Sequence, residues 1–247
     1  VCDTGLDTGN TSTMHLDVRG RVSRAYARSS RGVWSDPDGH GTHVVGSVLG
    51  NGAQSSSSIR GAAYEATLII QSVLDASGSL SGLPSDLNTL FLQTYTNQSS
   101  LAGARLHSNS WGVSVAGSYT TDSRAVDQFI FEHPDMLILF AAGNEGEDTS
   151  PADGVIDSDS MGAPATAKNC LTVGAAESYR TTGGYSQYVW GTGSWTNYYY
   201  TSPVSTDYIS RSPSGNGQGM AAFSSRGPCS DGRIKPDIVA PGTDILS

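Results

Sequence analysis

The alternation of apolar and polar segments along the chain predicts a series of buried strands. The clearest of these segments are short, nearly continuous apolar runs, which are typical of strands that are covered on both faces. The run at 136–142 (MLILFAA) is the most apolar of them. The predicted strands are 1–3, 67–74, 104–110, 136–142, 169–175 and 237–240.

Helices are predicted between several of these strands, because apolar residues recur there every three or four positions. The first helix is expected to end at Gly50, where a Gly-Asn-Gly sequence follows the last apolar position. The second is expected to open at Pro84, which lacks only an N–H that the first helical turn leaves unbonded. The predicted helices are 40–49, a segment from Pro84 through Leu92, and 121–133.

Strands that alternate with helices predict an α/β fold, in which helices cover both faces of a parallel β-sheet. A chain of 247 residues is consistent with one such domain. The chain begins and ends inside predicted elements, so we expect the sheet to be incomplete at both ends. Residues 10–39 are polar and rich in Gly, Ser and Arg, and are predicted to be mostly loop.

One segment, 178–220, departs from this pattern and is predicted to be an aromatic-rich insertion. It holds seven of the eleven tyrosines together with Trp190 and Trp195, interleaved with Gly, Ser and Thr. A surface β-hairpin or a long ordered loop is the favoured interpretation. An aromatic wall beside a substrate cleft is the alternative.

The net charge of −9 and the scatter of the basic residues argue against nucleic acid as a partner. Lys168 and Lys235 are the two lysines, and the arginines form no basic patch. No run of about 18 apolar residues is present, so no membrane span is predicted. Cys2, Cys170 and Cys229 have neither zinc-site spacing nor a disulfide framework; buried or incidental thiols are the favoured interpretation, and one disulfide is the alternative.

Two short motifs carry the candidate chemistry. Asp3 ends the first predicted strand in a Val-Cys-Asp-Thr-Gly sequence, and His40 lies between two glycines at the start of a predicted helix. A serine peptidase needs an imidazole to take the serine proton, a carboxylate to hold that imidazole and donors for the oxyanion. The order and combination of these motifs therefore favour catalysis over an ordinary turn aspartate and a structural histidine.

The chain resembles the subtilisin-like serine peptidases (subtilases), near the oxidatively stable alkaline protease branch. The motifs that carry the resemblance extend over most of the chain. They are DTGLDTG at 3–9, DGHGTHVVGSVLGNG at 38–52, NSWG at 109–112, LFAAGNEG at 139–146, the segment 160–175, FSSRGP at 223–228 and DGRIKPDIVAPGTDILS at 231–247. By this resemblance, residues 1–247 would be part of a subtilase catalytic domain.

The resemblance implies a role for each matching residue. Asp3 would be the triad aspartate, His40 the general base, and Asn144 the side-chain donor to the oxyanion. His43 would be structural, and Phe223 would lie on the leaving-group side. The implied substrate-binding residues are Ser110, Trp111 and Gly112, which would pair with the substrate backbone, and Ala141, Ala142 and Gly143, which would form a wall of the S1 pocket.

The serine motif of the family, a Gly-Thr-Ser-Met-Ala-type segment, is not found in the 247 residues. The nucleophile is therefore expected beyond Ser247, and these residues alone are expected to be inactive. The family further implies protein or peptide substrates, an N-terminal prosegment, secretion, and no cofactor for the chemistry.

A structural calcium ion is also considered, because family members often bind one. The candidate ligands form an acidic loop that lacks EF-hand spacing, so a solvated loop is favoured. These residues are Glu145, Glu147, Asp148, Asp153, Asp157 and Asp159.

Three other functions are weighed. An aspartic protease is suggested by the two Asp-Thr-Gly copies at Asp3 and Asp7, but such an enzyme needs aspartates from separate lobes or subunits. A metal enzyme could use His40, His43 and Asp3, although the histidine spacing suits one ligand face poorly. A catalytically dead, peptide-binding relative is separated from the favoured interpretation only by the missing serine segment.

Overall fold

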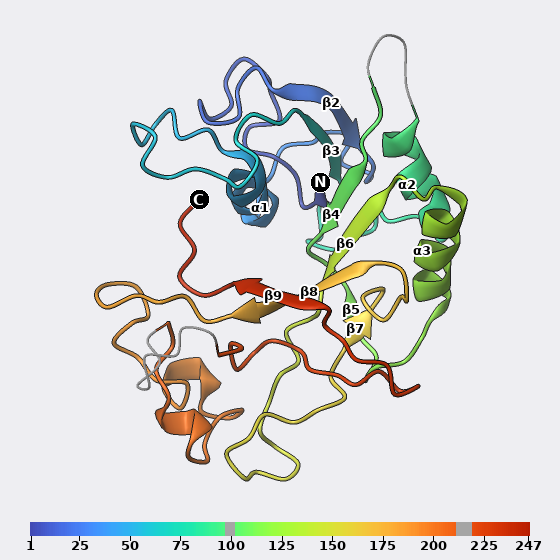
Figure 1. The fold of residues 1–247 in the computed structure, drawn as a ribbon. Coiled ribbons are helices and arrows are strands. Elements are labelled where there is room, and N and C mark those ends of the chain that lie inside the picture. Colours follow the sequence, from blue (N-terminus) through green and yellow to red (C-terminus); the bar gives the residue numbers. More distant parts are fainter. Residues whose placement is uncertain (97–101, 211–218) are drawn as a thin grey trace. The chain divides into compact units, whose positions relative to one another are not determined.

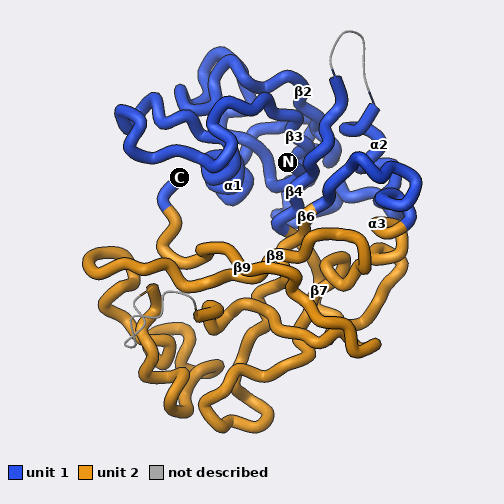
Figure 2. The backbone as a smooth tube through the Cα atoms, in the orientation of Figure 1, with its two compact units in different colours: residues 1–110, 128–138, 246–247 blue, residues 111–127, 139–245 orange. Residues whose placement is uncertain are grey.

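The computed structural model describes residues 1–96, 102–210 and 219–247. These residues form two compact units (Figure 2). Unit 1 comprises 1–110, 128–138 and 246–247, and unit 2 comprises 111–127 and 139–245. Each unit is built on parallel strands, so the predicted α/β class with a parallel sheet is confirmed.

Unit 1 contains four parallel strands that are hydrogen-bonded in the order β2-β3-β1-β4 (Figure 1). The central strand β1 is very short and pairs with a neighbour on each side, with Cys2 opposite Gln71 of β3 and Asn109 of β4. The bounds are β1 Cys2–Asp3, β2 Val22–Ala27, β3 Leu68–Ser72 and β4 Leu106–Asn109.

Strand β2 lies within the segment that was predicted to be mostly loop, and that prediction is wrong for its six residues. The sequence VSRAYA shows no run of apolar residues because β2 pairs only with β3 and its residues are half-buried or exposed. Arg24 of this strand is half-buried, and its Nη2 donates to the carbonyl of Ala102 at 2.7 Å.

Helices α1 (His40–Leu49) and α2 (Leu87–Tyr95) cover opposite faces of this sheet. Successive residues of a strand point to opposite faces. On one face, Leu68 and Ile70 of β3 share an apolar core with Val45 and Leu49 of α1. On the other face, Gln71 Nε2 donates to the carbonyl oxygen of Leu90 in α2 at 3.0 Å. The expectation of helices on both faces is thereby confirmed.

Helix α2 begins three residues later than predicted. The carboxylate of Asp86 accepts a hydrogen bond from the backbone N–H of Asn88 at 3.0 Å, which makes Asp86 the N-cap and leaves Pro84 outside the helix. Phe91 on this helix packs against Phe129, with ring centroids 5.4 Å apart. Phe129 belongs to α3 (Thr121–Glu132), the third predicted helix.

Unit 2 contains the parallel strands β6, β8 and β9, paired in that order, and β6 begins in the last two residues assigned to unit 1. A separate antiparallel pair joins β5 to β7. The bounds are β5 Val113–Ser114, β6 Leu137–Ala141, β7 Gly162–Ala163, β8 Leu171–Ala176 and β9 Ile238–Pro241.

The described part of the predicted insertion folds around its aromatic residues, while 211–218 lie outside the described residues. Its regular structure consists of the 3-10 helices η1 (Gly193–Trp195) and η2 (Val204–Thr206) and an antiparallel bridge between Val189 and Tyr208. Trp190 is 2% exposed and packs edge-on against Tyr199 at a centroid distance of 5.6 Å. Trp190, Tyr199 and Ile209 of this segment therefore share a small apolar cluster with Ala221 and Ala222, which follow it.

The three cysteines are buried and form no disulfide, as predicted. Within 1–96, 102–210 and 219–247, no helix is both long and apolar enough to cross a bilayer.

Candidate active site

Asp3 and His40 meet in unit 1. His40 Nδ1 lies 2.6 Å from Asp3 Oδ1, across 37 residues of sequence. The Asp3 side chain is 2% exposed, whereas that of His40 is 50% exposed. Asp3 is the last residue of β1 and His40 is the first of α1. A buried carboxylate thus fixes one ring nitrogen of an imidazole whose other side is accessible.

Thr4 joins the end of β1 to the start of α1. Its backbone N–H donates to Asp3 Oδ1 at 2.7 Å. Its hydroxyl donates to Asp36 Oδ1 at 2.8 Å and accepts the backbone N–H of Gly41, also at 2.8 Å. The turn after the strand and the first turn of the helix are therefore held together next to the Asp3–His40 pair.

Asp36 connects the Thr4 hydroxyl to the first turn of α1, although the sequence analysis did not identify this residue. Its Oδ2 accepts the backbone N–H of Thr42 at 2.8 Å and the hydroxyl of Thr42 at 2.6 Å. Burial alone would raise the pKa of Asp36, but the hydrogen bonds from Thr42 and Thr4 lower it below its ordinary value. Gly39 is the N-cap of α1 and has no side chain that could accept a hydrogen bond from the first helical turn. An acidic residue shortly before Gly39 was therefore the sequence signal that could have identified Asp36.

Gly41 has a packing role beside His40. A Cβ atom at this position would lie 2.5 Å from the carbonyl oxygen of Gly5, closer than van der Waals contact allows. Gly39 differs, because its φ of 92° lies in the left-handed region and the space around it is open. The two glycines that flank His40 are thus required for different reasons, close packing and backbone conformation.

The acidic surroundings raise the pKa of His40. The hydrogen bond to Asp3 is the main cause, burial of the ring opposes it, and the negative charges of Asp3, Asp38 and Asp36 add to it. This environment stabilises the imidazolium form, which is the form that a general base reaches after it has taken a proton.

The other predicted residue of unit 1, Ser110, directly follows β4. Since Cys2 is opposite Asn109 in the parallel pair β1–β4, Asp3 and Ser110 lie at the same edge of the sheet. This edge is formed by the carboxyl ends of the strands, where sites of open α/β sheets gather.

The remaining predicted residues belong to unit 2. Trp111 is half-buried, and its ring packs edge-on against Phe140 at a centroid distance of 5.1 Å. Gly112 is exposed; a Cβ there would lie 2.8 Å from the carbonyl oxygen of Ala163. Ala141 ends β6 and is exposed, while Ala142 is buried.

Asn144 is exposed on the turn that follows β6 and Ala142. Gly143 has a φ of 118°, and a Cβ there would lie 2.6 Å from Ser225 Oγ. The same hydroxyl oxygen accepts the backbone N–H of Glu145 at 3.0 Å, and the N–H of Ser225 donates to the carbonyl of Gly143 at 3.0 Å. Ser225 therefore fixes the backbone on both sides of Asn144, a role that its position in the FSSRGP motif did not reveal.

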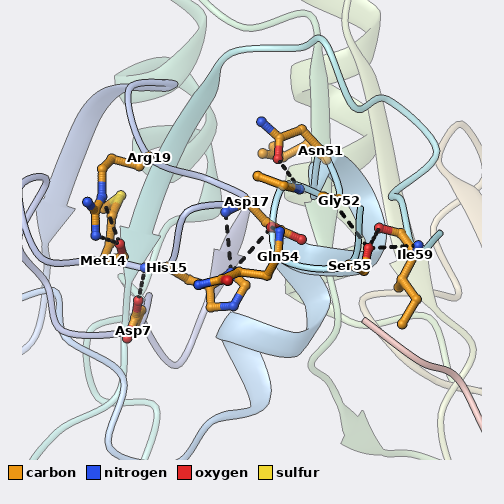
Figure 3. A network of polar contacts seen from close by, with 12 residues as sticks. Asp7, Met14, His15, Asp17, Arg19, Asn51, Gly52, Gln54, Ser55 and Ile59 are labelled. Carbon is orange, nitrogen blue, oxygen red and sulfur yellow. Dashed lines mark hydrogen bonds and ion pairs between the residues drawn. The ribbon is translucent and has the colours of Figure 1, made fainter. Parts of the chain in front are cut away.

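His43, the second histidine of the motif, is exposed and belongs to the wall of a cavity that also contains Leu6 and Asp17. Figure 3 shows the contacts around that cavity: the backbone N–H of His15 donates to the Asp7 carboxylate, and the N–H of Gln54 donates to Asp17 Oδ1 at 2.8 Å. Asp7 thus anchors the loop after β1, close in sequence to Asp3.

The acidic loop uses two of its carboxylates to hold its own backbone. Asp148 Oδ1 accepts the N–H of Asp153 at 2.9 Å, and Asp157 Oδ2 accepts the N–H groups of Thr149 and Ser150 at 3.0 and 2.9 Å. In the part of the chain that the structure describes, no cluster of three or more Asp, Glu, His or Cys side chains is arranged to hold a metal ion.

Comparisons with known proteins identify the family of the chain. The sequence profile of the subtilase family matches residues 1–247. The serine protease/ABC transporter B family protein tagD of Dictyostelium discoideum is 35% identical over 256 residues, which are 85% of this chain and 13% of that protein. The serine protease AprX of Bacillus subtilis is 28% identical over 255 residues, covering all of this chain and 46% of that protein.

A solved structure, that of the prenylagaramide maturation protease PagA, shares the fold. It matches with a TM-score of 0.56 at 23% sequence identity, over 99% of this chain and 63% of that one. The chain thus spans 13% of the Dictyostelium protein and less than half of AprX. Because the family profile extends over all 247 residues, the chain belongs to the subtilase family of serine peptidases.

Proposed function

We propose that this chain supplies the aspartate and the histidine of a serine endopeptidase, with His40 as general base and Asp3 as its orienting carboxylate. The 2.6 Å contact between His40 Nδ1 and the buried Asp3 carboxylate carries the proposal. Membership of the subtilase family supports the reaction class. The proposed substrates are proteins or peptides.

The proposed reaction uses the two ring nitrogens of His40 differently. With the Nδ1 proton donated to Asp3, Nε2 accepts the hydroxyl proton of the serine as its oxygen attacks the scissile carbonyl. Asp3 stabilises the resulting imidazolium. His40 then returns the proton to the leaving amine, and a water activated by the same nitrogen hydrolyses the acyl-enzyme.

The nucleophile is proposed to lie in a Gly-Thr-Ser-Met-Ala-type segment beyond Ser247. The side-chain amide of Asn144 is proposed to donate to the oxyanion, and its exposure on the turn fixed by Ser225 supports this role. Residues 110–112 and 141–143 are proposed to bind the substrate backbone and the S1 side chain.

The precursor is proposed to carry an N-terminal prosegment and to be secreted, as the family resemblance suggests. The chemistry is proposed to need no cofactor. A structural calcium ion at the acidic loop is the less favoured alternative to a solvated loop, and a calcium-dependent rise in melting temperature that Asp157→Ala with Asp159→Ala abolishes would support it.

The test is to express residues 1–247 together with the codons that follow them and to assay peptide hydrolysis. We expect activity that a fluorophosphonate blocks and that neither pepstatin nor a chelator affects. His40→Ala should remove nearly all of it, and Asn144→Ala should lower kcat by roughly 10²- to 10³-fold, the range typical of one lost oxyanion donor. His43→Ala is the matched control and should leave kcat nearly unchanged.

The second candidate function is a catalytically dead, peptide-binding subtilase. A folded full-length protein that neither hydrolyses peptides nor reacts with the fluorophosphonate would favour it. Residues 1–247 alone are predicted to be inactive, so hydrolysis by them that a fluorophosphonate blocks would contradict the proposed position of the serine.

A further inference from the structure

Unit 2 contains a cavity of about 480 Å³ that none of the predicted active-site residues lines. One side of it is formed by the aromatic-rich segment, including Trp190 and Val204, and another by Val155 and Ile156. Three ionisable side chains reach it: Glu177, Asp207 and Arg226.

Glu177 is held at this cavity with one carboxylate oxygen bonded. It directly follows β8 and is 4% exposed. Its backbone N–H donates to the carbonyl of Gly219 at 2.8 Å, and its Oε1 accepts the indole N–H of Trp190 at 2.8 Å. Among the described residues, its Oε2 receives no hydrogen bond. Burial raises the pKa of Glu177 to about 7; the Trp190 hydrogen bond opposes this, and the charge of Asp207 adds to it.

Asp207 is the second carboxylate at the cavity. Its Oδ1 accepts the backbone N–H of Tyr208 at 2.9 Å, and its backbone carbonyl accepts the N–H of Trp190 at 3.0 Å. Burial raises the pKa of Asp207 as well. Within the described residues, neither Glu177 nor Asp207 has a basic side chain within ion-pair distance.

Arg226 does not supply this positive charge, because its guanidinium is hydrogen-bonded to backbone carbonyl groups. Nη1 donates to the carbonyl oxygens of Ser224 at 2.8 Å and Ala222 at 3.1 Å, which holds the turn that precedes it. Two carboxylates therefore face one guanidinium that is bonded to the backbone. A buried carboxylate without a partner is unfavourable, so the ionised cavity would be stabilised by one further cation.

The chemistry of the walls favours an organic cation over a metal ion. A calcium ion takes six or more oxygen ligands, and the cavity offers two carboxylates. Val155, Ile156 and Val204 provide an apolar wall, and such a wall suits the methylene stem of an alkylammonium or alkylguanidinium group, whose charged head needs an acidic partner.

We propose that this cavity binds a primary alkylammonium or alkylguanidinium group, such as the end of a lysine or arginine side chain. The charged head lies against Glu177 and Asp207, and the stem lies against Val155, Ile156 and Val204. The site is independent of the proposed proteolysis, because its residues take no part in the catalytic steps.

The experiment is calorimetric titration of the full chain with n-butylammonium at about pH 8, with n-butanol and butyrate as uncharged and anionic probes. We expect n-butylammonium to bind and the other two not to bind. Binding should strengthen between about pH 6 and about pH 8, because the cation requires ionised Glu177. Binding is measured without peptide cleavage, so the result does not depend on whether the protein is an active protease.

Glu177→Gln and Asp207→Asn are the informative variants. Each keeps an oxygen for its Trp190 or Tyr208 donor, and each should weaken n-butylammonium binding by about tenfold or more. Glu65→Gln is the matched control; it removes the same charge from an exposed position that does not line the cavity and should bind like the wild type. Melting curves of all variants verify that they are folded.

One further probe, compared with n-butylammonium, distinguishes the source of the cation. If Nα-acetyl-lysine methylamide binds with the same variant dependence, the site takes a lysine side chain, and if only n-butylammonium binds, it takes a small free amine. Both outcomes support the proposal. Equal binding of n-butanol, binding of butyrate in place of the amine, calcium binding lost in the same variants, or no binding of any amine would each overturn it.

Discussion

The hydroxyl of Thr4 lies 2.8 Å from Asp36 Oδ1. It links the turn after the first strand to Asp36, whose carboxylate accepts the backbone N–H of Thr42 in the first turn of α1. Because the same hydroxyl accepts the N–H of Gly41, it fixes the two backbone segments that carry Asp3 and His40. The position of the Asp3–His40 pair therefore depends on a residue that takes no part in proton transfer.

Thr4→Val keeps the shape of the side chain and removes these hydrogen bonds. We expect the free energy of unfolding to fall by about 1–3 kcal/mol, because the buried N–H of Gly41 and the half-buried carboxylate of Asp36 lose their partner. In the full-length enzyme kcat should fall while KM changes little. Urea denaturation and steady-state kinetics measure these effects. Thr8→Val, at an exposed position of the same loop, should change neither quantity, and an equal effect there would contradict the link.

The raised pKa of His40 predicts a pH dependence with a definite sign. Activity requires neutral His40, so it should rise with pH through this raised pKa and be favoured at alkaline pH. The contribution of His40 to stability has the opposite sense: it is fully present below the ordinary histidine pKa and is lost as pH rises through the raised folded value.

Asp3→Asn removes the main cause of this shift. The pKa of His40 should then fall toward its ordinary range, which NMR titration of the imidazole Cε1 proton measures, with His40→Ala to assign the signal. Even so, activity should be lost rather than moved to lower pH, because an amide favours the wrong tautomer of the ring. An unchanged His40 titration in Asp3→Asn would contradict the assignment of cause.

Gly41→Ala tests the close packing between α1 and the turn after β1. The added Cβ would meet the Gly5 carbonyl, so we expect a loss of about 1–3 kcal/mol in the free energy of unfolding and weaker activity. Gly39→Ala is the comparison, where only the left-handed φ opposes the change, at about 1–2 kcal/mol. If Gly41→Ala leaves activity and stability intact, the contact does not position His40.

Ser225→Ala should disturb the turn that carries Asn144. It removes the acceptor for the Glu145 N–H and leaves space beside Gly143. We expect kcat to fall with little change in KM, because the oxyanion donor would be less firmly placed in the transition state. Ser158→Ala, at an exposed position of the acidic loop, is the control. A change in KM alone would indicate a role in substrate binding.

Much of the fold could be predicted because its buried strands and its helices repeat apolar residues at the right intervals. The subtilase resemblance and the parallel α/β class are confirmed. Strand β2 could not be found this way, since an edge strand with half-buried residues has no apolar run. The start of α2 was misplaced because Pro84 and Asp86 are both typical of helix starts, and only the Asp86 hydrogen bond decides between them.

The Asp3–His40 contact could be predicted from two motifs, but the residues that support it could not. Asp36 and Ser225 act through hydrogen bonds to backbone groups that are distant in sequence or lie in a turn, and no periodic pattern records such contacts. The sequence showed His40 between two glycines, but only the structure shows that Gly41 packs against Gly5.

The three buried thiols have an experimental consequence. Thiolate, not thiol, reacts with alkylating reagents, and burial raises the pKa of both Cys170 and Cys229, so labelling of the folded protein should be slow. Cys2 belongs to unit 1, and Cys170 and Cys229 belong to unit 2. Their labelling rates, separated by mass spectrometry, would therefore report the opening of each unit individually.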